Sequence, residues 1–169
     1  MSSRTTLVLG GAASGKSAYA ESLFDDATGP LTYIATAQAF DAEMAEKIRL
    51  HAARRGLRWN TVEAPIKAAE ALGRLHLTDS CLLDCATMWL TNQLLADTDL
   101  AAEQARLMIA IADCSARLVI VTNEVGYGIV PDNALARRFR EAQGRLNIAL
   151  AATAGQVVQV IAGLPQVLK

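Results

Sequence analysis

Five short segments of the chain are apolar at successive positions and rich in β-branched residues. A continuous apolar run, in place of a strict alternation, is typical of a strand that is buried on both faces of a parallel sheet. We therefore predict strands at these positions. They cover residues 5–9, 31–35, 81–85, 117–122 and 156–161.

Helical periodicity fills the stretches between these segments. Strands that alternate with helices predict an α/β fold with right-handed crossovers and a mostly parallel sheet. Residues 59–63 are a candidate for a short extra strand, and residues 166–169 are a candidate for an edge strand. The predicted helices cover residues 16–27, 40–56, 66–75, 87–96, 101–114 and 133–154.

Composition supports a single domain over residues 1–169. The chain has 16 Lys and Arg against 17 Asp and Glu, so its net charge is −1. A charge so close to zero argues against a broad basic surface for nucleic acid. Hydrophobic residues make up 52% of the chain, which excludes disorder. Charged residues make up 20%, which leaves room for an apolar contact between subunits.

The expected location is the cytoplasm, without membrane insertion. Three cysteines do not form a disulfide framework of the secreted kind. The first apolar run stops at Gly10 and is too short for a secretory signal. No stretch approaches the roughly 18–20 apolar residues that span a bilayer.

A phosphate-binding loop is the clearest motif. Residues 10–17 fit the pattern G-x-x-x-x-G-K-[ST], directly after the first predicted strand and at the start of the first predicted helix. In such a loop, backbone N–H groups and the positive end of the helix face phosphate oxygens. Lys16 is expected to reach the β- and γ-phosphates, and the Ser17 hydroxyl is expected to bind Mg²⁺. The predicted phosphate-binding residues are Gly10, Gly11, Ala12, Ala13, Ser14, Gly15, Lys16 and Ser17.

Two acidic residues follow predicted strands. Asp84 ends the third strand, where phosphate-loop proteins place a carboxylate that supports Mg²⁺ or orients the nucleophile. Ligands of open α/β sheets bind at the carboxyl ends of the strands, where Glu124 also lies. The alternative for Asp84 is a cap of the helix that starts near Thr87. The alternative for Glu124 is a turn residue that only bonds the backbone.

The phosphate loop does not by itself name a reaction. An enzyme that acts on a small molecule and a switch that signals by binding GTP both carry one. Switch GTPases usually read guanine with Asn-Lys-x-Asp after a strand. Here the comparable strand ends in Thr122-Asn123-Glu124-Val125-Gly126, which lacks the Lys and the Asp, so the enzyme is favoured.

A basic stripe surrounds one histidine. Lys47, His51 and Arg55 are spaced by four residues, so they share one face of the predicted helix, with Arg54 and Arg58 beside them. A neutral imidazole in such a setting can attack phosphorus and form a covalent intermediate. On the pattern alone, the ordinary interpretation is an exposed surface histidine.

The order of these motifs resembles one family over nearly the whole chain. It is the bifunctional adenosylcobinamide kinase/adenosylcobinamide-phosphate guanylyltransferase family of cobalamin assembly. The stretch from Asn123 to Pro131, Asn-Glu-Val-Gly-x-Gly-Ile-Val-Pro, is the most specific match. The other matching segments are the phosphate loop, Tyr33-Ile34-Ala35-Thr36-Ala37, Asp41-x-Glu43-Met44 with Ile48-x-x-His51, Trp59-x-Thr61-Val62-Glu63, Leu83-Asp84-Cys85-x-Thr87-x-Trp89-Leu90-Thr91-Asn92, Leu135-Ala136-Arg137-x-Phe139-Arg140 and Gly144-x-x-Asn147.

This resemblance implies a RecA-like P-loop fold with three layers, a homotrimer, and two reactions. In the first, adenosylcobinamide receives the γ-phosphoryl group of ATP or GTP, with Mg²⁺. In the second, His51 attacks the α-phosphate of GTP, carries GMP as a phosphoramidate, and passes it to adenosylcobinamide phosphate. The implied catalytic residues are His51, Lys16 and Asp84, and the implied nucleotide contacts beyond the loop are Ala35, Thr36, Ala37, Ala52, Ala53, Arg54, Arg55, Glu63 and Asp84.

One position departs from the family's pattern. The family's loop usually has Arg where this chain has Ala13. The backbone cradle does not depend on that side chain. An Arg there would contact phosphate or a neighbouring subunit, so its absence bears on the strength and the phosphate contacts of the kinase step. Beside this family, two alternatives stay open: a small-molecule kinase without guanylyl transfer, and a GTP-binding switch that is not an enzyme.

Overall fold

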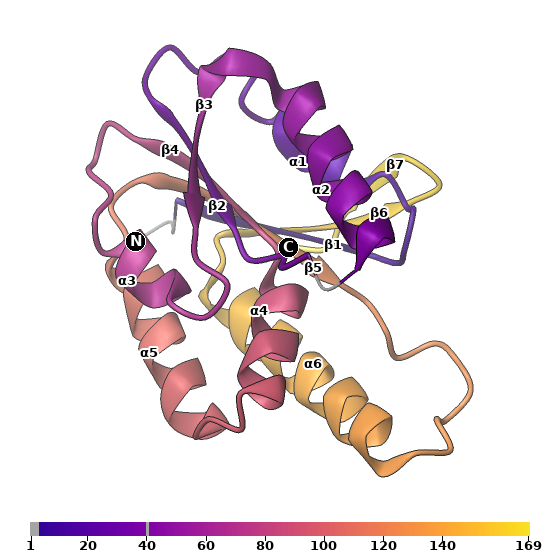
Figure 1. Ribbon diagram of the computed structural model, residues 1–169. Coiled ribbons are helices and arrows are strands. Elements are labelled where there is room, and N and C mark those ends of the chain that lie inside the picture. The colour runs from indigo at the N-terminus through magenta and orange to yellow at the C-terminus, as the bar shows by residue number, and fades with distance from the viewer. Residues whose placement is uncertain (1–3, 40) are drawn as a thin grey trace.

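A single sheet of seven strands organises the chain in a computed structural model, which describes residues 4–39 and 41–169 apart from the side chains of Met44, Lys47 and Arg54. The strand order is β3-β2-β4-β5-β1-β6-β7 (Figure 1). All pairs are parallel except β6 with β7. The strands are β1 (Thr5–Gly10), β2 (Leu31–Ala35), β3 (Trp59–Glu63), β4 (Ser80–Asp84), β5 (Arg117–Asn123), β6 (Gln156–Ile161) and β7 (Leu164–Val167).

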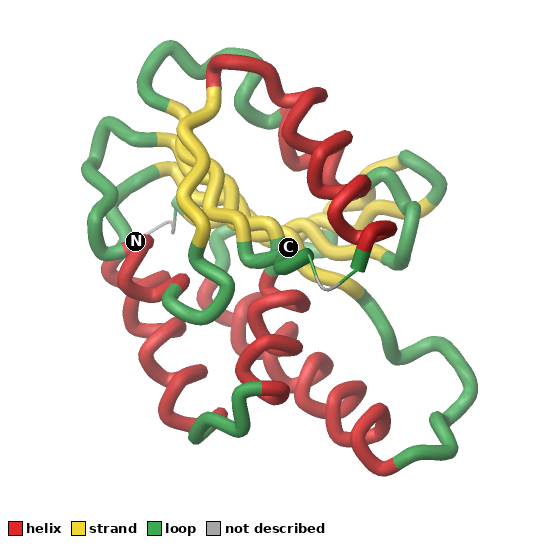
Figure 2. The backbone as a smooth tube through the Cα atoms, in the orientation of Figure 1, coloured by secondary structure: helices red, strands yellow, loops and turns green. Residues whose placement is uncertain are grey.

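Helices cover both faces of this sheet, so the predicted three-layer α/β fold is confirmed. Helices α3, α4, α5 and α6 cover one face of the sheet, and α1 and α2 lie on the opposite face (Figure 2). No described helix is both long and apolar enough to cross a membrane. The helices are α1 (Lys16–Ser22), α2 (Ala42–Arg55), the 3₁₀ turn η1 (Gly56–Arg58), α3 (Ala68–Leu72), α4 (Ala86–Leu95), α5 (Leu100–Asp113) and α6 (Ala134–Thr153).

The core explains why the strand segments are apolar at successive positions. Leu7 and Ile120 belong to the cluster under α3 to α6, whereas Val8 and Val119 belong to the cluster that contains Phe24 beside α1. Neighbouring residues of one strand point to opposite faces, and both faces are covered. Burying one such side chain contributes about 1.5–3 kcal/mol.

Several predicted boundaries differ from the structure. Helix α1 ends at Ser22 and not at residue 27, because turns such as Phe24 N–H to Glu21 C=O follow it. Helix α3 is shorter than residues 66–75 and ends before Gly73. The predicted start of the second helix at Phe40 lies outside the described residues.

The last strand begins two residues earlier than predicted. Ala162 and Gly163 both have left-handed backbones, with φ of 52° and 77°. Two such residues form a tight hairpin turn that matches the twist of antiparallel strands. The chain therefore reverses directly after β6, and Leu164 pairs with Ile161.

Register places the predicted functional segments at one edge of the sheet. Gly10 of β1 is opposite Asn123 of β5, and Ala35 of β2 is opposite both Asp84 of β4 and Glu63 of β3. Because these strands are parallel, their carboxyl ends form a single rim. A ligand at this rim meets the phosphate loop and the acidic residues together.

Candidate active site

The phosphate loop lies between β1 and α1. Gly15 stands at the N-cap of α1 with φ of 91°, a conformation that favours glycine. A Cβ atom on Gly10 would lie 2.6 Å from the carbonyl oxygen of Val160, so only glycine fits there. Ala13 is exposed at the tip of the loop and has φ of 54°.

Lys16 is folded back onto its own loop. Its Nζ donates a hydrogen bond to the carbonyl oxygen of Gly11 at 3.0 Å. Burial lowers the pKa of Lys16, and the charges of Cys85 and Asp84 partly oppose that shift. The loop and the end of β4 are therefore close enough to interact electrostatically.

Asp84 lies at the floor of a cavity. The Tyr33 hydroxyl donates a hydrogen bond to its Oδ2 atom at 3.0 Å. Burial raises the pKa of Asp84 above its usual range, although Tyr33, His51 and Lys16 each act in the opposite direction. Its alternative role as a helix cap is excluded, because α4 is capped by Cys85, whose Sγ accepts the N–H of Met88 at 3.4 Å.

Glu124, the second acidic candidate, has a structural partner. Its Oε1 atom accepts a hydrogen bond from the backbone N–H of Gly126. This is the backbone-bonding turn that was the alternative interpretation of Glu124.

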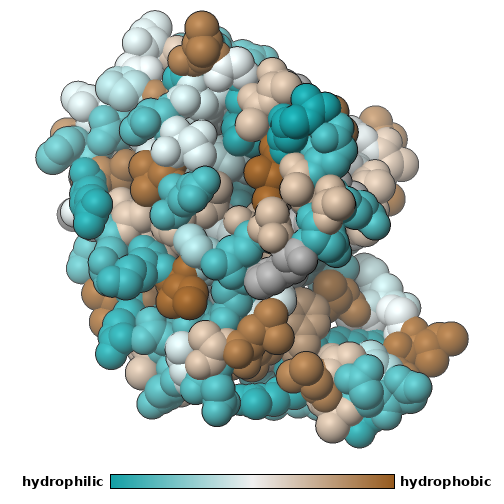
Figure 3. All heavy atoms as spheres, in the orientation of Figure 1, coloured by the Kyte–Doolittle hydropathy of each residue, from teal (hydrophilic) through white to brown (hydrophobic). Residues whose placement is uncertain are grey.

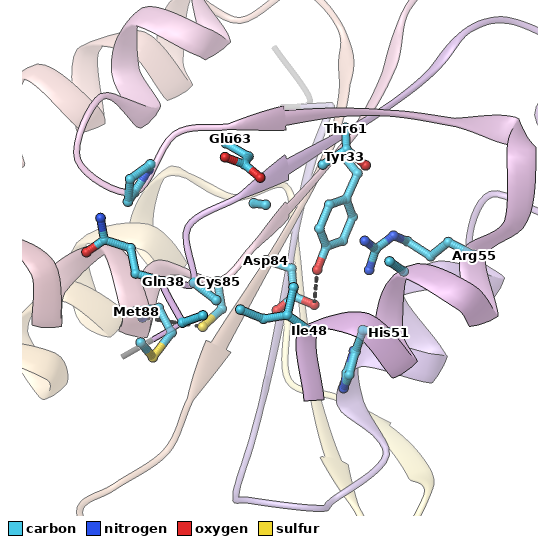
Figure 4. A pocket seen from close by; sticks show the side chains of 15 residues that line it. Tyr33, Gln38, Ile48, His51, Arg55, Thr61, Glu63, Asp84, Cys85 and Met88 are labelled. Carbon is cyan, nitrogen blue, oxygen red and sulfur yellow. Dashed lines mark hydrogen bonds between the residues drawn. The ribbon is translucent and has the colours of Figure 1, made fainter. Parts of the chain in front are cut away.

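A cavity of about 620 Å³ brings several predicted residues together. His51 and Arg55 reach it from α2, Glu63 from the end of β3, and Asp84 from the end of β4 (Figure 4). The sequence predicted no site role for Gln38, for Met88 or for Tyr33, although Tyr33 opens a matching segment, and all three side chains line this wall. The full wall is formed by Tyr33, Ala35, Ala37, Gln38, Ala39, Ile48, His51, Ala52, Arg55, Thr61, Glu63, Pro65, Asp84, Cys85 and Met88.

The cavity wall does not contain every predicted contact. None of the described lining residues belongs to the phosphate loop. Ala53 is exposed on α2, and the side chains of Lys47 and Arg54 lie outside the described part of that helix. The cavity and the loop are thus neighbouring parts of one rim.

Arg55 stacks on an aromatic ring of the wall. Its guanidinium carbon lies 3.4 Å from the centroid of the Tyr33 ring, a cation–π geometry. Its Nη1 atom is buried and has no hydrogen-bond partner among the described residues. The residue therefore retains donor capacity beside His51, one helical turn away.

Thr36 supports the site from behind. It is fully buried. Its Oγ1 donates to the carbonyl oxygen of Cys85 at 2.7 Å and accepts the Cys85 N–H at 2.8 Å. Its own carbonyl oxygen accepts the side-chain amide of Asn92 at 2.8 Å. These bonds join the ends of β2 and β4, so the hydroxyl predicted to contact nucleotide is engaged within the protein.

Asn123 is a polar residue at the rim that lies in the most specific matching stretch, although the sequence assigned it no role of its own. Its N–H donates to Thr87 Oγ1 at 2.8 Å, and its carbonyl accepts from Asn147 Nδ2 at 3.0 Å. Thr122 and Gln143 complete this buried network through the Asn147 Oδ1 atom. The polar run Thr-Asn-Glu after an apolar strand is the signal that marks it.

The predicted magnesium ligands have the right chemistry. Ser17 supplies a hydroxyl oxygen and Asp84 a carboxylate oxygen, the hard donors that Mg²⁺ prefers, with substrate phosphates and water filling the other positions. No cluster of three or more His, Cys, Asp or Glu side chains suited to a metal occurs in the described part of the chain.

Known proteins match this chain over almost its full length. The sequence model described as cobinamide kinase / cobinamide phosphate guanyltransferase matches residues 6–168. The bifunctional adenosylcobalamin biosynthesis protein CobP of Pseudomonas aeruginosa is 43% identical over 166 residues, covering 96% of both chains. The protein CobU of Salmonella typhimurium is 43% identical over 175 residues, covering 94% of this chain and 96% of that one.

A structural match bears on the fold alone. The crystal structure of the RadB recombinase superposes with a TM-score of 0.52 at 15% identity, covering 92% of this chain and 73% of the other. This likeness agrees with the predicted RecA-like P-loop architecture.

Proposed function

The chain belongs to the cobinamide kinase / cobinamide phosphate guanyltransferase family, and from this premise we propose how its residues carry out the two reactions. It is a transferase of cobalamin biosynthesis. In the kinase reaction, a hydroxyl group of adenosylcobinamide takes the γ-phosphoryl group of a nucleoside triphosphate. In the guanylyltransferase reaction, GMP from GTP joins that new phosphate and yields adenosylcobinamide-GDP.

For the kinase reaction, the phosphate loop from Gly10 to Ser17 holds the triphosphate. Lys16 leaves the Gly11 carbonyl and pairs with the β- and γ-phosphates. Ser17 and Asp84 hold Mg²⁺, which neutralises phosphate charge when bound. The position of Asp84 at the rim, within electrostatic range of Lys16, supports this role.

For the guanylyltransferase reaction, His51 is the nucleophile. A nitrogen lone pair of the neutral imidazole attacks the α-phosphorus of GTP; an N–P bond forms and the P–O bond to pyrophosphate breaks. A phosphate oxygen of adenosylcobinamide phosphate then attacks the same phosphorus, and the N–P bond breaks. Arg55, with Lys47 and Arg54, offsets the charge of the triphosphate.

The remaining predicted contacts form the rest of the nucleotide site. Ala35, Ala37 and Ala52 line the cavity and leave room for a base or ribose, and Glu63 offers acceptors to a base. Thr36 acts indirectly, because its hydroxyl bonds the backbone of Cys85 at the end of β4. Ala53 is the remaining predicted nucleotide contact in the segment that follows His51. The use of GTP and ATP and the cytoplasmic location stay predictions.

A homotrimer also stays a prediction, and surface apolar residues support it. Tyr127 and Ile129 are 86% and 96% exposed in the loop before α6, and Leu95 and Leu135 are exposed beside a groove between α4 and α6. Figure 3 shows apolar residues on this side of the molecule. Light scattering of the purified chain would measure the mass of the assembly.

The observation that carries the proposal is the single cavity wall that contains His51, Arg55 and Asp84. The test uses GTP labelled at the α- or the γ-phosphate, with Mg²⁺, followed by denaturation. We expect label from the α-position alone, stable to alkali and labile to acid. His51→Ala should abolish it, and His76→Ala, which changes the chain's other histidine, should not.

Two other results would each support another function. Transfer of the γ-phosphoryl group to the corrinoid without labelled protein is the result for a plain kinase. Tight GTP binding without any transfer is the result for a switch.

A further inference from the structure

Tyr33 touches groups that serve different reactions. Its hydroxyl donates to Asp84 Oδ2 at 3.0 Å, and its ring lies under the Arg55 guanidinium at 3.4 Å. Asp84 belongs to the proposed kinase site, and Arg55 lies one turn after the proposed nucleophile His51. Figure 4 shows the ring between these two side chains.

The ring itself is held in place. Tyr33 is 6% exposed. Trp59 meets it edge-on, with ring centroids 6.3 Å apart, and Phe24 meets Trp59 in the same manner at 5.3 Å. Because the hydrophobic core fixes the ring plane, the hydroxyl and the stacking face both have fixed positions.

We propose that Tyr33 is a positioning residue shared by the two reactions: its hydroxyl orients the Asp84 carboxylate for phosphoryl transfer, and its ring seats Arg55 and helix α2 beside the cavity for guanylyl transfer. This inference rests on the proposed function. It assigns separate tasks to the two parts of one side chain.

The stacked geometry suits Arg55 to a ligand. A guanidinium that packs by its face keeps its N–H donors in the plane, directed outward. The buried Nη1 atom, which lacks a partner within the described residues, is such a donor. The Tyr33 ring therefore holds the cation without consuming the hydrogen bonds that a phosphate oxygen needs.

The hydroxyl has a separate purpose. A phenylalanine would fill the same space and stack on the same guanidinium, so packing alone does not require the oxygen. The Tyr33 hydroxyl donates a hydrogen bond to the Oδ2 atom of Asp84, which restricts the orientation of that carboxylate.

The test separates the two tasks with two substitutions. Tyr33→Phe removes the hydroxyl and keeps the ring, and Tyr33→Met removes the ring while filling much of its volume. Phosphoryl transfer to adenosylcobinamide and covalent labelling from α-labelled GTP are measured separately. Tyr19→Phe is the matched control, because Tyr19 packs against the same core cluster and is not among the residues that line the cavity.

Tyr33→Phe should lower kcat of the kinase reaction by about tenfold or more, the size expected for a lost hydrogen bond to a charged group. Its KM for the triphosphate and its rate of labelling should stay within about twofold of wild type. Tyr33→Met should lower both reactions. A faster rate of covalent labelling in Tyr33→Phe than in Tyr33→Met would show that the ring, and not the hydroxyl, supports the reaction of His51.

Equal losses of both reactions in Tyr33→Phe, or no loss of kinase activity, would overturn the inference. Tyr33→Phe decides the role of the hydroxyl even where Tyr33→Met does not fold, which a thermal melt reveals. Wild type tests the proposed function itself: absence of both reactions in wild type removes that function, whereas full activity of both in Tyr33→Phe removes only the role of Tyr33.

Discussion

Gly163 donates its backbone N–H to the carbonyl oxygen of Ser14 at 2.8 Å. This bond ties the turn of the C-terminal hairpin to the phosphate loop. A Cβ atom on Gly15 would lie 3.0 Å from the Gly163 Cα, so the two segments are in close contact. The last two strands therefore support the backbone that is proposed to hold phosphate.

Gly163→Ala should raise KM for the triphosphate several-fold in both reactions. An alanine at φ of 77° is strained by about 1–2 kcal/mol, and relief of that strain moves the turn and the loop with it. Gly73→Ala is the control, because Gly73 has a helical backbone and a Cβ there would make only ordinary van der Waals contacts, at 3.6 Å from the carbonyl oxygens of Ala69 and Glu70. Initial rates against triphosphate concentration measure the effect, and an unchanged KM would show that the hairpin does not position the loop.

The phosphate loop was predictable because its pattern is local. Eight consecutive residues between a strand and a helix carry the whole signal. The bond from Gly163 to Ser14 and the bond from Tyr33 to Asp84 join residues that are far apart in the chain. Such contacts depend on strand order, which a single sequence does not reveal.

The same contrast applies to the fold. The strands were predictable because both of their faces are buried, which leaves a continuous apolar run. The early start of β7 was missed because all four of its residues are exposed and give no apolar pattern. The sequence pattern alone favours an exposed surface position for His51, and only the resemblance implies that it is a nucleophile. Its position in the cavity wall depends on how α2 packs in three dimensions.

Ala13→Arg should lower KM for the triphosphate in the kinase reaction. Ala13 already has a left-handed backbone and is exposed, so another non-glycine side chain adds little strain. A cation at the loop tip attracts phosphate, and salt screens that attraction. Kinetics at low and high salt measure the effect, with Ala13→Gln as the uncharged control. An equal effect of both substitutions would exclude charge as the cause.

Thr87→Val should destabilise the protein by about 1–3 kcal/mol, because the buried Thr87 hydroxyl is the acceptor of the partly buried N–H of Asn123. Thr91→Val is a control on the same helix. The Thr91 hydroxyl donates only to the carbonyl oxygen of Thr87 and is partly exposed. Urea unfolding measures both variants, and equal losses would contradict the role assigned to Thr87.

The three cysteines should react with a thiol reagent in a fixed order. Burial raises the pKa of Cys85 to about 12 and also raises the pKa of Cys81 and of Cys114. The thiolate is the reactive form, so reaction is slow near pH 8 and speeds up as pH rises. Cys114 is partly exposed and should be modified first, with Cys81 and Cys85 modified only after unfolding. Mass spectrometry of peptides measures the order, and early modification of Cys81 would contradict it.

Asp84→Asn should stabilise the protein at neutral pH while abolishing the kinase reaction. Burial raises the pKa of Asp84 in the folded state, whereas an unfolded aspartate has a pKa of about 3.9. Between these two values the folded protein keeps a proton that the unfolded chain has lost, so the free energy of unfolding falls as pH rises. Asparagine has no charge to bury and still accepts the Tyr33 hydrogen bond.

The stability advantage of Asp84→Asn should therefore be near zero below a pH of about 3.9 and grow above it. Thermal unfolding in the presence of EDTA measures it, at about 2–4 °C for each kcal/mol. Asp26→Asn is a control of opposite sign. A hydrogen bond from Arg117 lowers the pKa of Asp26, so its loss should destabilise the protein at neutral pH and not in acid. If Asp84→Asn instead destabilises the protein at neutral pH, as Asp26→Asn should, then the buried Asp84 carboxylate does not lower the stability of the folded protein and the prediction is wrong.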